Sequence, residues 1–438
     1  MNIIRNLINK NLILVTLAIW LIVSVVYFCR TPPKTRSTDW WGHPIYTKII
    51  SQKHRFPKPH EHWQTYNPPL YYIINSFISP SYFKTNITIH KNRVRLLSIL
   101  YGAITLWIIL WLLKQTSENK MAQFLAALFI STTPNFVMIF TTYNNDSLNT
   151  MLCVGLIALA HKLNKNWSWK YGLILLIVAT AAAYTKYTSL WCFLTVCILC
   201  CTNLLFKKFP SKNQLKIISI FILAFCLFTP WLIFRNYGQT KKFFPFNDYS
   251  IFNKKVSLGL ILNNAKERLK IPVLQQPPNT WNNPFVDPQG NPGKKFNYWS
   301  MTFIHSVINE WSYTFPPEEL IYLLLWVHLI VNLITLRKVF DLNITKQAFL
   351  SILVIHLIHL IYFLTLRESY GLATAISYRF IAWSYAAWAI LYSKGLSGKE
   401  YWSYILRRIF LIGIILQVYF LFACDDTNFI DNSKGFLF

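Results

Sequence analysis

The stretch from Val94 to Leu113, VRLLSILYGAITLWIILWLL, sets the fold class of this chain. After Arg95 it runs for eighteen residues without a charged side chain, and Lys114 follows it directly. An α-helix needs roughly 20 predominantly apolar residues to cross a bilayer. A helix that is apolar on every side must be surrounded by lipid or by protein. We therefore predict a membrane-spanning helix here.

Similar apolar runs recur along the whole chain, which predicts an all-α integral membrane protein with about eleven spans. The runs are Leu12–Phe28, Val94–Leu113, Met121–Thr141, Ser147–His161, Tyr171–Tyr184, Thr188–Phe206, Leu215–Phe234, Leu320–Leu336, Ala348–Leu366, Ala373–Tyr392 and Ile405–Phe422. The first run lacks a small-residue cleavage site, so we expect it to be retained as a helix. Leu70–Ile78 is apolar but too short to span, and we expect an interfacial or re-entrant helix there.

Composition supports the membrane assignment, and the placement of the basic residues explains the large positive charge. Hydrophobic residues make up 54% of the 438 residues and charged ones 13%, with a mean hydropathy of +0.34. Soluble domains carry about a quarter charged residues. The net charge of +27 comes mainly from Lys and Arg between the apolar runs, where the positive-inside rule and anionic lipid explain them. No basic stripe with interleaved aromatics is present, so we expect no nucleic-acid partner.

The basic connectors predict an orientation and a domain layout. If the N-terminus is cytoplasmic, every short inner connector is basic, which places the C-terminus outside. The first outer loop is then 29–69, and a long outer loop with many prolines and asparagines is 235–319. We predict three parts: a core with the first outer loop (1–234), an extracytoplasmic subdomain (235–319) and C-terminal spans (320–438).

Polar residues able to do chemistry collect on the predicted outer side. Ionisable residues at helix ends within lipid-depth sequence are candidates for function by default. Asp39 and His43 have i, i+4 spacing, which puts them on one face of a helix, and Asp39 could act as a general base. Candidate catalytic carboxylates are Asp39, Asp146 and Glu61, and candidate substrate-binding residues are His43, Tyr66, Asn67, Asn145, Lys186, Arg235 and Arg379.

Each candidate also has a purely structural interpretation. Asp39 and Asp146 precede predicted helices and could serve as N-caps. Lys186 could extend its ammonium to the membrane interface, and the same holds for Arg235 and Arg379. Arginine is, however, the side chain best suited to bidentate phosphate binding.

Metal and redox sites have weaker support in the sequence. His54, His60, Glu61 and His62 match no strong ligand spacing. The Cys197-x-x-Cys200 pair lies inside an apolar helix, where packing explains it better than chemistry. No cofactor is indicated, and a divalent metal requirement is left open.

The order of the motifs on the outer side resembles a known family. Asp39-x-x-x-His43-x-x-Tyr46 is followed by Asn67-Pro68-Pro69-Leu70-Tyr71-Tyr72, then Arg95-Leu96-Leu97-Ser98, Asn144-Asn145-Asp146, Thr185-Lys186-Tyr187 and Tyr378-Arg379-Phe380. This order resembles the GT-C superfamily of membrane glycosyltransferases, in its protein-mannosyltransferase and aminoarabinose-transferase branch. The resemblance covers the first half of the chain well and the second half thinly.

The resemblance implies a reaction and a set of partners. A sugar would arrive on a polyprenyl or dolichyl phosphate, and an acceptor hydroxyl on a lipid, glycan or protein would attack its anomeric carbon with inversion. By position Asp39 matches the family's acid–base site, while Lys186, Arg235 and Arg379 are candidates to hold the leaving phosphate and Asp146 would orient a partner. The chain departs from the family pattern at Trp40, where an Asp-Glu pair is typical.

Two other function classes fit the composition. A transporter or lipid flippase is the main alternative, although such proteins usually show helices broken by Gly or Pro near the midplane, and this chain has 13 glycines. A non-catalytic membrane scaffold is the third. We expect a multi-pass protein of a bacterial inner membrane with its site on the extracytoplasmic side. The sugar, the acceptor and the oligomeric state are not encoded in any recognisable motif.

Overall fold

The computed structural model describes a helical bundle. The described residues are 2–32, 42–59, 61–62, 64–78, 87–201, 210–243, 302–303, 306–308, 318–339, 343–362, 378–398 and 401–423. Every regular element within these ranges is a helix, so the predicted all-α fold class is confirmed there.

The first half of the chain supplies most of the bundle. Its elements are α1 (Asn2–Arg30), α2 (Gly42–Lys53), α3 (Leu70–Ile78), α5 (Ile87–Thr116), α6 (Lys120–Ser131), α7 (Pro134–Thr141), α8 (Asp146–Lys165), α9 (Trp169–Ala183), α10 (Ser189–Cys201), α11 (Lys212–Pro230), the π-helix η2 (Trp231–Tyr237) and α12 (Gly238–Thr240). The short helix predicted at Leu70–Ile78 is α3, with the same bounds.

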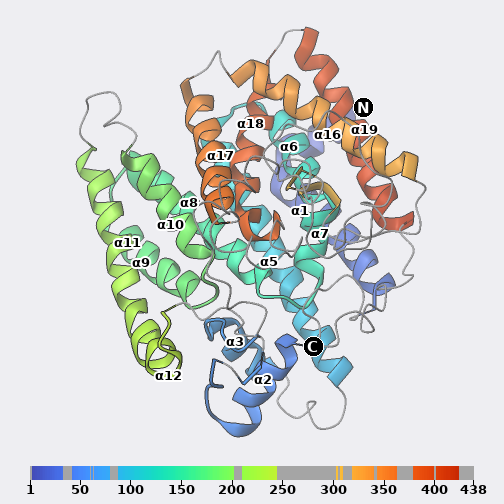
Figure 1. The fold of residues 1–438 in the computed structure, drawn as a ribbon. Coiled ribbons are helices and arrows are strands. Elements are labelled where there is room, and N and C mark those ends of the chain that lie inside the picture. The colour runs from blue at the N-terminus through green and yellow to red at the C-terminus, as the bar shows by residue number, and fades with distance from the viewer. Residues whose placement is uncertain are drawn as a thin grey trace, which may run out of the picture.

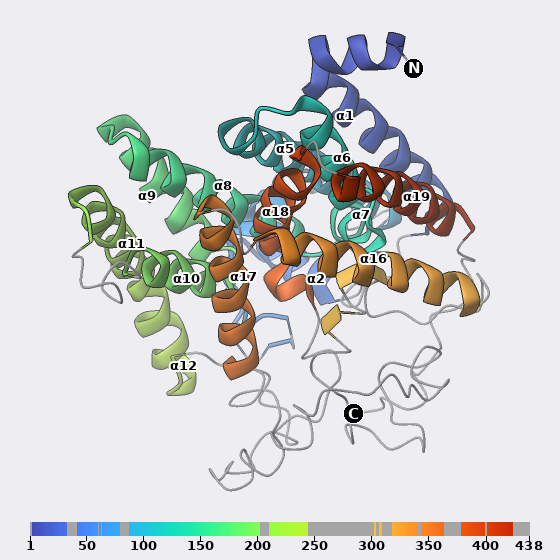
Figure 2. The same ribbon diagram turned by 90° about the horizontal axis from the view of Figure 1, so that it is seen from above.

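The second half adds α16 (Glu318–Val339), α17 (Asn343–Tyr362), the 3-10 segment η7 (Tyr378–Ser384), α18 (Tyr385–Ser397) and α19 (Tyr401–Ala423). Figure 1 shows α1, α5, α6 and α18 near the centre, with α8–α11 on one side, α16 and α19 on the other, and α17 between α10 and α18. Figure 2 shows the same arrangement from above, with α17 beside α10, which it contacts.

Among the described residues, five helices are long and apolar enough to cross a membrane: the Asn11–Arg30 part of α1, α5, the α11–α12 run, the Leu320–Arg337 part of α16, and α19. A bent pair, α6 with α7, raises the number to six. Large apolar side chains are exposed along them, such as Ile22 of α1, Ile222 of α11 and Ile415 of α19. Exposed apolar stripes of this length require lipid as solvent. The chain is therefore a multi-pass membrane protein, and the predicted number of eleven spans stays a prediction.

The predicted continuous span Met121–Thr141 is a broken helix in the structure. Its halves, α6 and α7, meet at 63°, because Pro134 has no N–H to continue the hydrogen-bond ladder. The Thr133 hydroxyl donates to the Phe129 carbonyl (2.8 Å), and Thr132 donates to Gln417 Oε1 of α19 (2.5 Å). These bonds satisfy polar groups that the break frees at membrane depth.

The predicted span Ala373–Tyr392 also differs. Residues 373–377 lie outside the described residues, and Tyr378–Ser384 forms a 3-10 segment with a kink at Ile381 before α18 begins. This irregular segment carries Arg379 and Phe380, so the deviation from a regular helix falls on predicted site residues.

One close helix contact fixes the core. Trp20 of α1 is fully buried and lies edge-on to Phe136 and Phe140. Its ring also lies directly over Gly102 of α5, where an added Cβ would collide with the indole. Glycine at this position lets α1 reach α5 and the broken α6–α7 unit together.

Candidate active site

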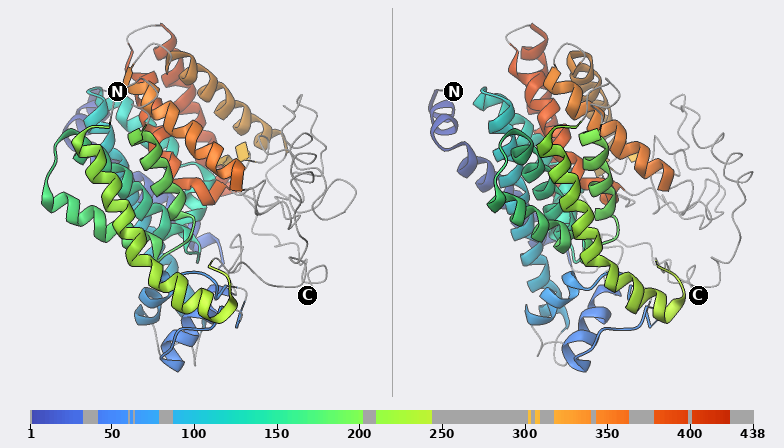
Figure 3. Two further views of the ribbon diagram at one scale, coloured as in Figure 1. Left: turned by 60° about the vertical axis from the view of Figure 1, so that its left-hand side comes forward. Right: turned by 90° about the vertical axis from the view of Figure 1, so that its left-hand side faces the viewer.

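Hydrogen bonds between loops hold together the end of the bundle that carries α2 and α3. Figure 3 shows these two helices at the end opposite the start of α1. The Leu70 N–H of α3 donates to the Tyr184 carbonyl after α9 (2.8 Å), and the Tyr187 hydroxyl donates to the Tyr66 carbonyl (2.9 Å). The segment before α3 is thus held against the α9–α10 loop.

Asp146 is the centre of a buried charged cluster. Its Oδ1 is 2.5 Å from Lys186 Nζ, and its Oδ2 is 3.9 Å from Arg379 Nε. The three side chains are 1%, 11% and 12% exposed, so the carboxylate is enclosed while both cations keep some access. They come from the start of α8, the α9–α10 loop and η7, which only the fold brings together. We call these three residues the charged triad.

The structure resolves the capping interpretation of Asp146. The Ser147 N–H donates to Asn144 Oδ1 (3.0 Å), so Asn144 satisfies the first turn of α8. Asp146 is the first helical residue, where the helix dipole favours a negative side chain, and its carboxylate is turned to Lys186 instead of the backbone. Lys186 is directed inward to this carboxylate, not outward to the interface.

Formal charge leaves the triad with one excess positive charge, since one carboxylate faces two cations. The Phe380 ring adds an aromatic surface, with its centroid 5.0 Å from Lys186 Nζ and 5.2 Å from the Arg379 guanidinium carbon. A buried group of this kind can hold an anion such as a phosphate.

His43 belongs to a layer of aromatic and polar side chains beside the triad. Its Nδ1 is 3.0 Å from the Tyr72 hydroxyl, and its ring stacks on Tyr143. The Tyr143 hydroxyl is 3.0 Å from Thr47 Oγ1 and 3.2 Å from His90 Nε2. Tyr143 begins the loop that leads into Asp146, so this layer connects α2, α3 and α5 to the triad.

Arg235 is placed by the π-helix and binds the backbone. Its guanidinium donates to the carbonyls of Pro57 (2.9 Å), Thr65 and Tyr66 (3.4 Å), and it lies on the Trp231 ring. Arginine with five fixed donors suits this task. The arrangement favours a role in holding the 57–66 segment over direct phosphate binding, which remains a prediction for this residue.

Glu61 lies in more exposed surroundings than the charged triad does. It accepts two hydrogen bonds from Arg55 (2.7 and 2.8 Å) and one from the Lys58 N–H (3.0 Å) in an exposed turn. The Arg55 hydrogen bonds are the main reason that the pKa of Glu61 is lowered to about 2. Such a fully engaged carboxylate is a weak base, which does not favour the predicted catalytic role.

Three other predicted residues act through backbone or local contacts. The Tyr66 carbonyl accepts from Tyr187 and Arg235, as above. Asn67 Nδ2 is 2.5 Å from Gln64 Oε1, and the Asn67 carbonyl accepts from the Tyr46 hydroxyl (3.2 Å). Asn145 is buried beside Asp146, and its carbonyl accepts the Asn149 N–H (3.1 Å). These contacts hold the loops in which the three residues lie.

Asp39, the predicted acid–base residue, lies outside the described residues. The same holds for Trp40, His60 and residues 244–301 of the predicted long outer loop. Within the part that the structure describes, no group of three His, Cys, Asp or Glu side chains is arranged to hold a metal ion.

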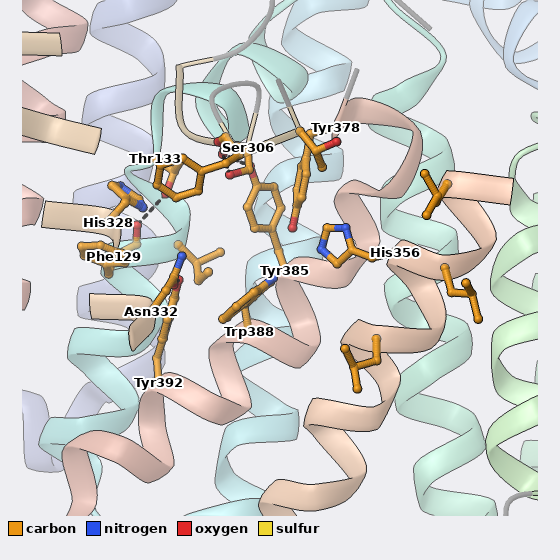
Figure 4. Close-up of a pocket in the computed structure, with 16 residues that line it drawn as sticks. Phe129, Thr133, Ser306, His328, Asn332, His356, Tyr378, Tyr385, Trp388 and Tyr392 are labelled. Atoms are coloured by element: carbon orange, nitrogen blue, oxygen red, sulfur yellow. Dashed lines mark hydrogen bonds between the residues drawn. The ribbon is translucent and has the colours of Figure 1, made fainter. Parts of the chain in front are cut away.

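A separate cavity of about 440 Å³ lies between α6, α16, α17 and α18. Figure 4 shows the labelled side chains around it, with Tyr378 and Tyr385 on one side and His328 and Asn332 on another. The wall is mostly apolar, and its polar groups are largely engaged: Tyr392 donates to Asn332 (2.6 Å) and Tyr385 to the Ser306 carbonyl (2.8 Å). Tyr378 directly precedes Arg379, so this cavity and the triad share η7.

Sequence reasoning missed several residues at this end of the bundle. Thr47, Asn75 and His90 were not singled out, and Tyr71 and Tyr143 entered only as parts of longer motifs. One signal was available: Asn75 interrupts the apolar run Leu70–Ile78 four residues after Tyr71, which places both on one face of a short helix. His90 and Thr47 had no such signal, because their partners are distant in sequence.

The fold and the charged triad together describe a polytopic helical membrane protein with a buried ionic cluster. The chain resembles the archaeal oligosaccharyltransferase AglB from Archaeoglobus fulgidus in complex with an inhibitory peptide and a dolichol-phosphate (TM-score 0.50, 13% identity, covering 97% of this chain and 57% of that one). It also resembles the same enzyme in its apo form (0.50, 13%, 96% and 57%) and tethered to an acceptor peptide containing the NVT sequon (0.51, 12%, 98% and 59%). The chain spans less than two thirds of the length of these enzymes.

The sequence adds a match to a family model over part of the chain. Residues 83–234, from just before α5 into η2, match the family model described as dolichyl-phosphate-mannose-protein mannosyltransferase. No curated protein sequence matches the chain. The domain match and the fold thus show similarity to membrane glycosyltransferases of the GT-C superfamily, the family that the motif order resembles.

Proposed function

We propose that this protein transfers a sugar from a polyprenyl-phosphate or dolichyl-phosphate carrier to an acceptor hydroxyl on the extracytoplasmic face of a membrane, a bacterial inner membrane in the simplest case. The observation that carries this proposal is the charged triad. A buried carboxylate with two cations, at the loop end of a GT-C fold, suits an anionic group presented from the bilayer.

In this proposal the cations receive the charge that develops on the leaving group. The acceptor oxygen forms a bond to the anomeric carbon as the bond from that carbon to the phosphate oxygen breaks. Lys186 and Arg379 stabilise the phosphate oxygen that gains charge. Asp146 holds both cations in place. Asp39 takes the acceptor proton, a role that rests on its position in the family motif.

The neighbouring cavity supports a lipid-linked donor. Its wall is apolar, Leu353 and Leu357 line it while being about half exposed, and α17 faces lipid on that side. Cavities of this size accommodate small-molecule ligands. A prenyl chain could enter from the bilayer while its phosphate reaches the triad through the shared η7 segment. One AglB structure contains dolichol-phosphate, which is consistent with a lipid phosphate for this chain.

The test supplies radiolabelled polyprenyl-phosphate sugars and a mixture of lipid, glycan and peptide acceptors to the purified protein in detergent. We expect label on an acceptor, with transfer lost in Asp39→Asn and strongly reduced in Lys186→Gln. Arg55→Gln, which removes an exposed arginine from the same end of the molecule, is the matched control and should retain transfer.

A transporter or flippase would behave differently. It would move labelled lipid between the leaflets of proteoliposomes without cleaving the sugar–phosphate bond. Transbilayer movement without cleavage, unchanged in Asp39→Asn, would overturn the proposal.

A further inference from the structure

A group of lysines far from the charged triad has no acidic partner. The sequence contains no Asp or Glu from Ser147 to Asn247. Lys170 at the start of α9, and Lys212 and Lys216 at the start of α11, are exposed. None of the three forms an ion pair among the residues that the structure describes. An anion from outside the chain can supply the missing countercharge.

The fold brings these lysines together at one corner of the bundle. α8 begins at the triad and runs for 20 residues, or about 30 Å, so its last turn lies at the opposite end. The Asn213 side chain of α11 donates to the Asn164 carbonyl of α8 (3.3 Å). α9 and α11 pack side by side (Figure 1), and a Cβ on Gly172 of α9 would lie 3.4 Å from the Trp167 ring and 3.6 Å from Ile220 of α11. The starts of α9 and α11 and the connector before α9 therefore form one surface.

Two tryptophans on this surface surround the ammonium of Lys216. Its Nζ is 4.7 Å from the ring centroid of Trp167 and 5.7 Å from that of Trp169. Trp169 is 76% exposed, and the two rings meet edge to face at 5.5 Å. Tryptophan is enriched at the depth of lipid head groups. Since one cation already lies over both rings, a second cation such as choline is repelled here, while an anion is attracted.

Beyond the lysines, both helices present apolar side chains on the same face. On α9, Lys170, Leu173 and Ile177 have i, i+3, i+7 spacing, and both apolar side chains are 59% exposed. On α11, Lys216 and Leu223 are seven residues apart, and Leu223 is 47% exposed. Ile177 lies about 10 Å along the helix from Lys170. Positive charge at one end and exposed apolar side chains behind it complement an anionic amphiphile.

We infer that the starts of α9 and α11 form a binding site for an anionic phospholipid, with its phosphate bound by Lys170 and Lys216 and its acyl chains along the apolar faces of the two helices. Basic sites between spanning helices bind anionic head groups on the cytoplasmic side of membranes, and the basic connectors predict that side for this end of the bundle. The site lies at the opposite end from the triad, so the inference does not depend on the proposed function.

The experiment compares the binding of phosphatidylglycerol and of phosphatidylcholine with the same acyl chains to the purified full chain in neutral detergent. Native mass spectrometry counts the bound lipids. A lysine near an anionic head group strengthens binding about fivefold, so the first phosphatidylglycerol should bind about 25-fold more tightly than phosphatidylcholine. In Lys170→Gln/Lys216→Gln this ratio should fall to about one, and each single variant should lose about fivefold. Equal affinities for the two lipids in the unaltered protein would overturn the inference.

The matched control is Arg337→Gln/Arg408→Gln, which removes the same charge from exposed positions on α16 and α19. These two helices pack against each other and against α18. The control should keep the 25-fold ratio. If it loses as much as the lysine variant does, the preference arises from a diffuse positive field and the proposed site is wrong. If the double lysine variant unfolds, the two single variants carry the same test.

Inorganic phosphate distinguishes a lipid site from a site for a free anion. Because the acyl chains contribute to binding in this proposal, millimolar phosphate should leave the bound phosphatidylglycerol in place. Displacement of the lipid by phosphate alone would show that the apolar faces of α9 and α11 play no part, and it would overturn the assignment to a phospholipid.

Discussion

Asp146 and Glu61 are both carboxylates at the same end of the molecule, and both are paired with a cation, yet their surroundings differ. Asp146 is 1% exposed and lies 2.5 Å from Lys186, with Arg379 also near. Glu61 pairs with Arg55, which is only six residues away in the same loop, and the two side chains are 24% and 43% exposed. Water screens the second pair and not the first. Proximity of opposite charges therefore does not separate the two carboxylates, while burial beside two cations does, and this burial is why we propose a functional role for Asp146.

Of the two carboxylates, Asp146 should show the larger effect when it is changed to Asn. Removing the charge leaves Lys186 buried without its carboxylate, which typically costs 3–5 kcal/mol, and we expect transfer to fall on the order of 100-fold. Thermal unfolding in detergent and the transfer assay measure both. If Asp146→Asn proved as stable as Glu61→Gln, the predicted energetic difference between the two carboxylates would be wrong.

A smaller effect is expected for Arg235→Met, which tests what holds the Glu61 segment. The change leaves the carbonyls of Pro57, Thr65 and Tyr66 without their donor, so we expect a loss of about 1–3 kcal/mol. Hydrogen exchange should become faster in residues 57–66 and stay unchanged in α8. Equal exchange in both regions would contradict the assignment of Arg235 to this segment.

Combining Asp146→Asn with Lys186→Gln should sharpen the comparison further. The two side chains are in contact, so their effects should couple by about 0.5–3 kcal/mol, and the double variant should be more stable than the sum of the single variants predicts. The same cycle with Glu61→Gln and Arg55→Gln should show little coupling, since that pair is exposed. Additive effects at Asp146 and Lys186 would mean that their contact carries no energy.

The smallest effect concerns pH. The pKa of Glu61 is lowered from 4.5 to about 2 in the folded protein, so its contribution is complete above about pH 4.5 and is lost as the pH falls toward 2. Glu61→Gln should therefore lower stability slightly at neutral pH and flatten the acid side of the stability curve. A profile identical to that of the unaltered protein would show that Arg55 gives no net stabilisation.

Much of the fold could be predicted from hydropathy. Each predicted apolar run falls on a helix where the structure describes it, and Leu70–Ile78 matched α3 at both ends. The break at Thr132–Pro134 was missed, although Pro134 was visible, because its repair depends on Gln417 from the far end of the chain. The pattern of apolar residues along the sequence indicates local structure and carries no information about partners that are distant in the sequence.

The site was predictable in part. Grouping residues by membrane face was enough to select Asp146, Lys186 and Arg379, which the fold brings together. It could not separate Arg235 from Arg379, since both lie at helix ends and only the π-turn directs Arg235 to backbone carbonyls. Asp39 keeps its predicted role as a proposal. Asn75 escaped notice because an amide within an apolar run has no motif.

The π-helix at Trp231–Tyr237 has a consequence for how this site tolerates length changes. A π-turn holds one residue more than an α-turn does, so it corresponds to a single-residue insertion in a regular helix. Deleting one residue between Pro230 and Arg235 would remove this extra residue, so the turn would close with α-helical geometry and would no longer direct Arg235 as the wider turn does. Arg235 would then leave the 57–66 segment. Chain length in this turn, and not only the identity of its residues, is thus part of what builds the site.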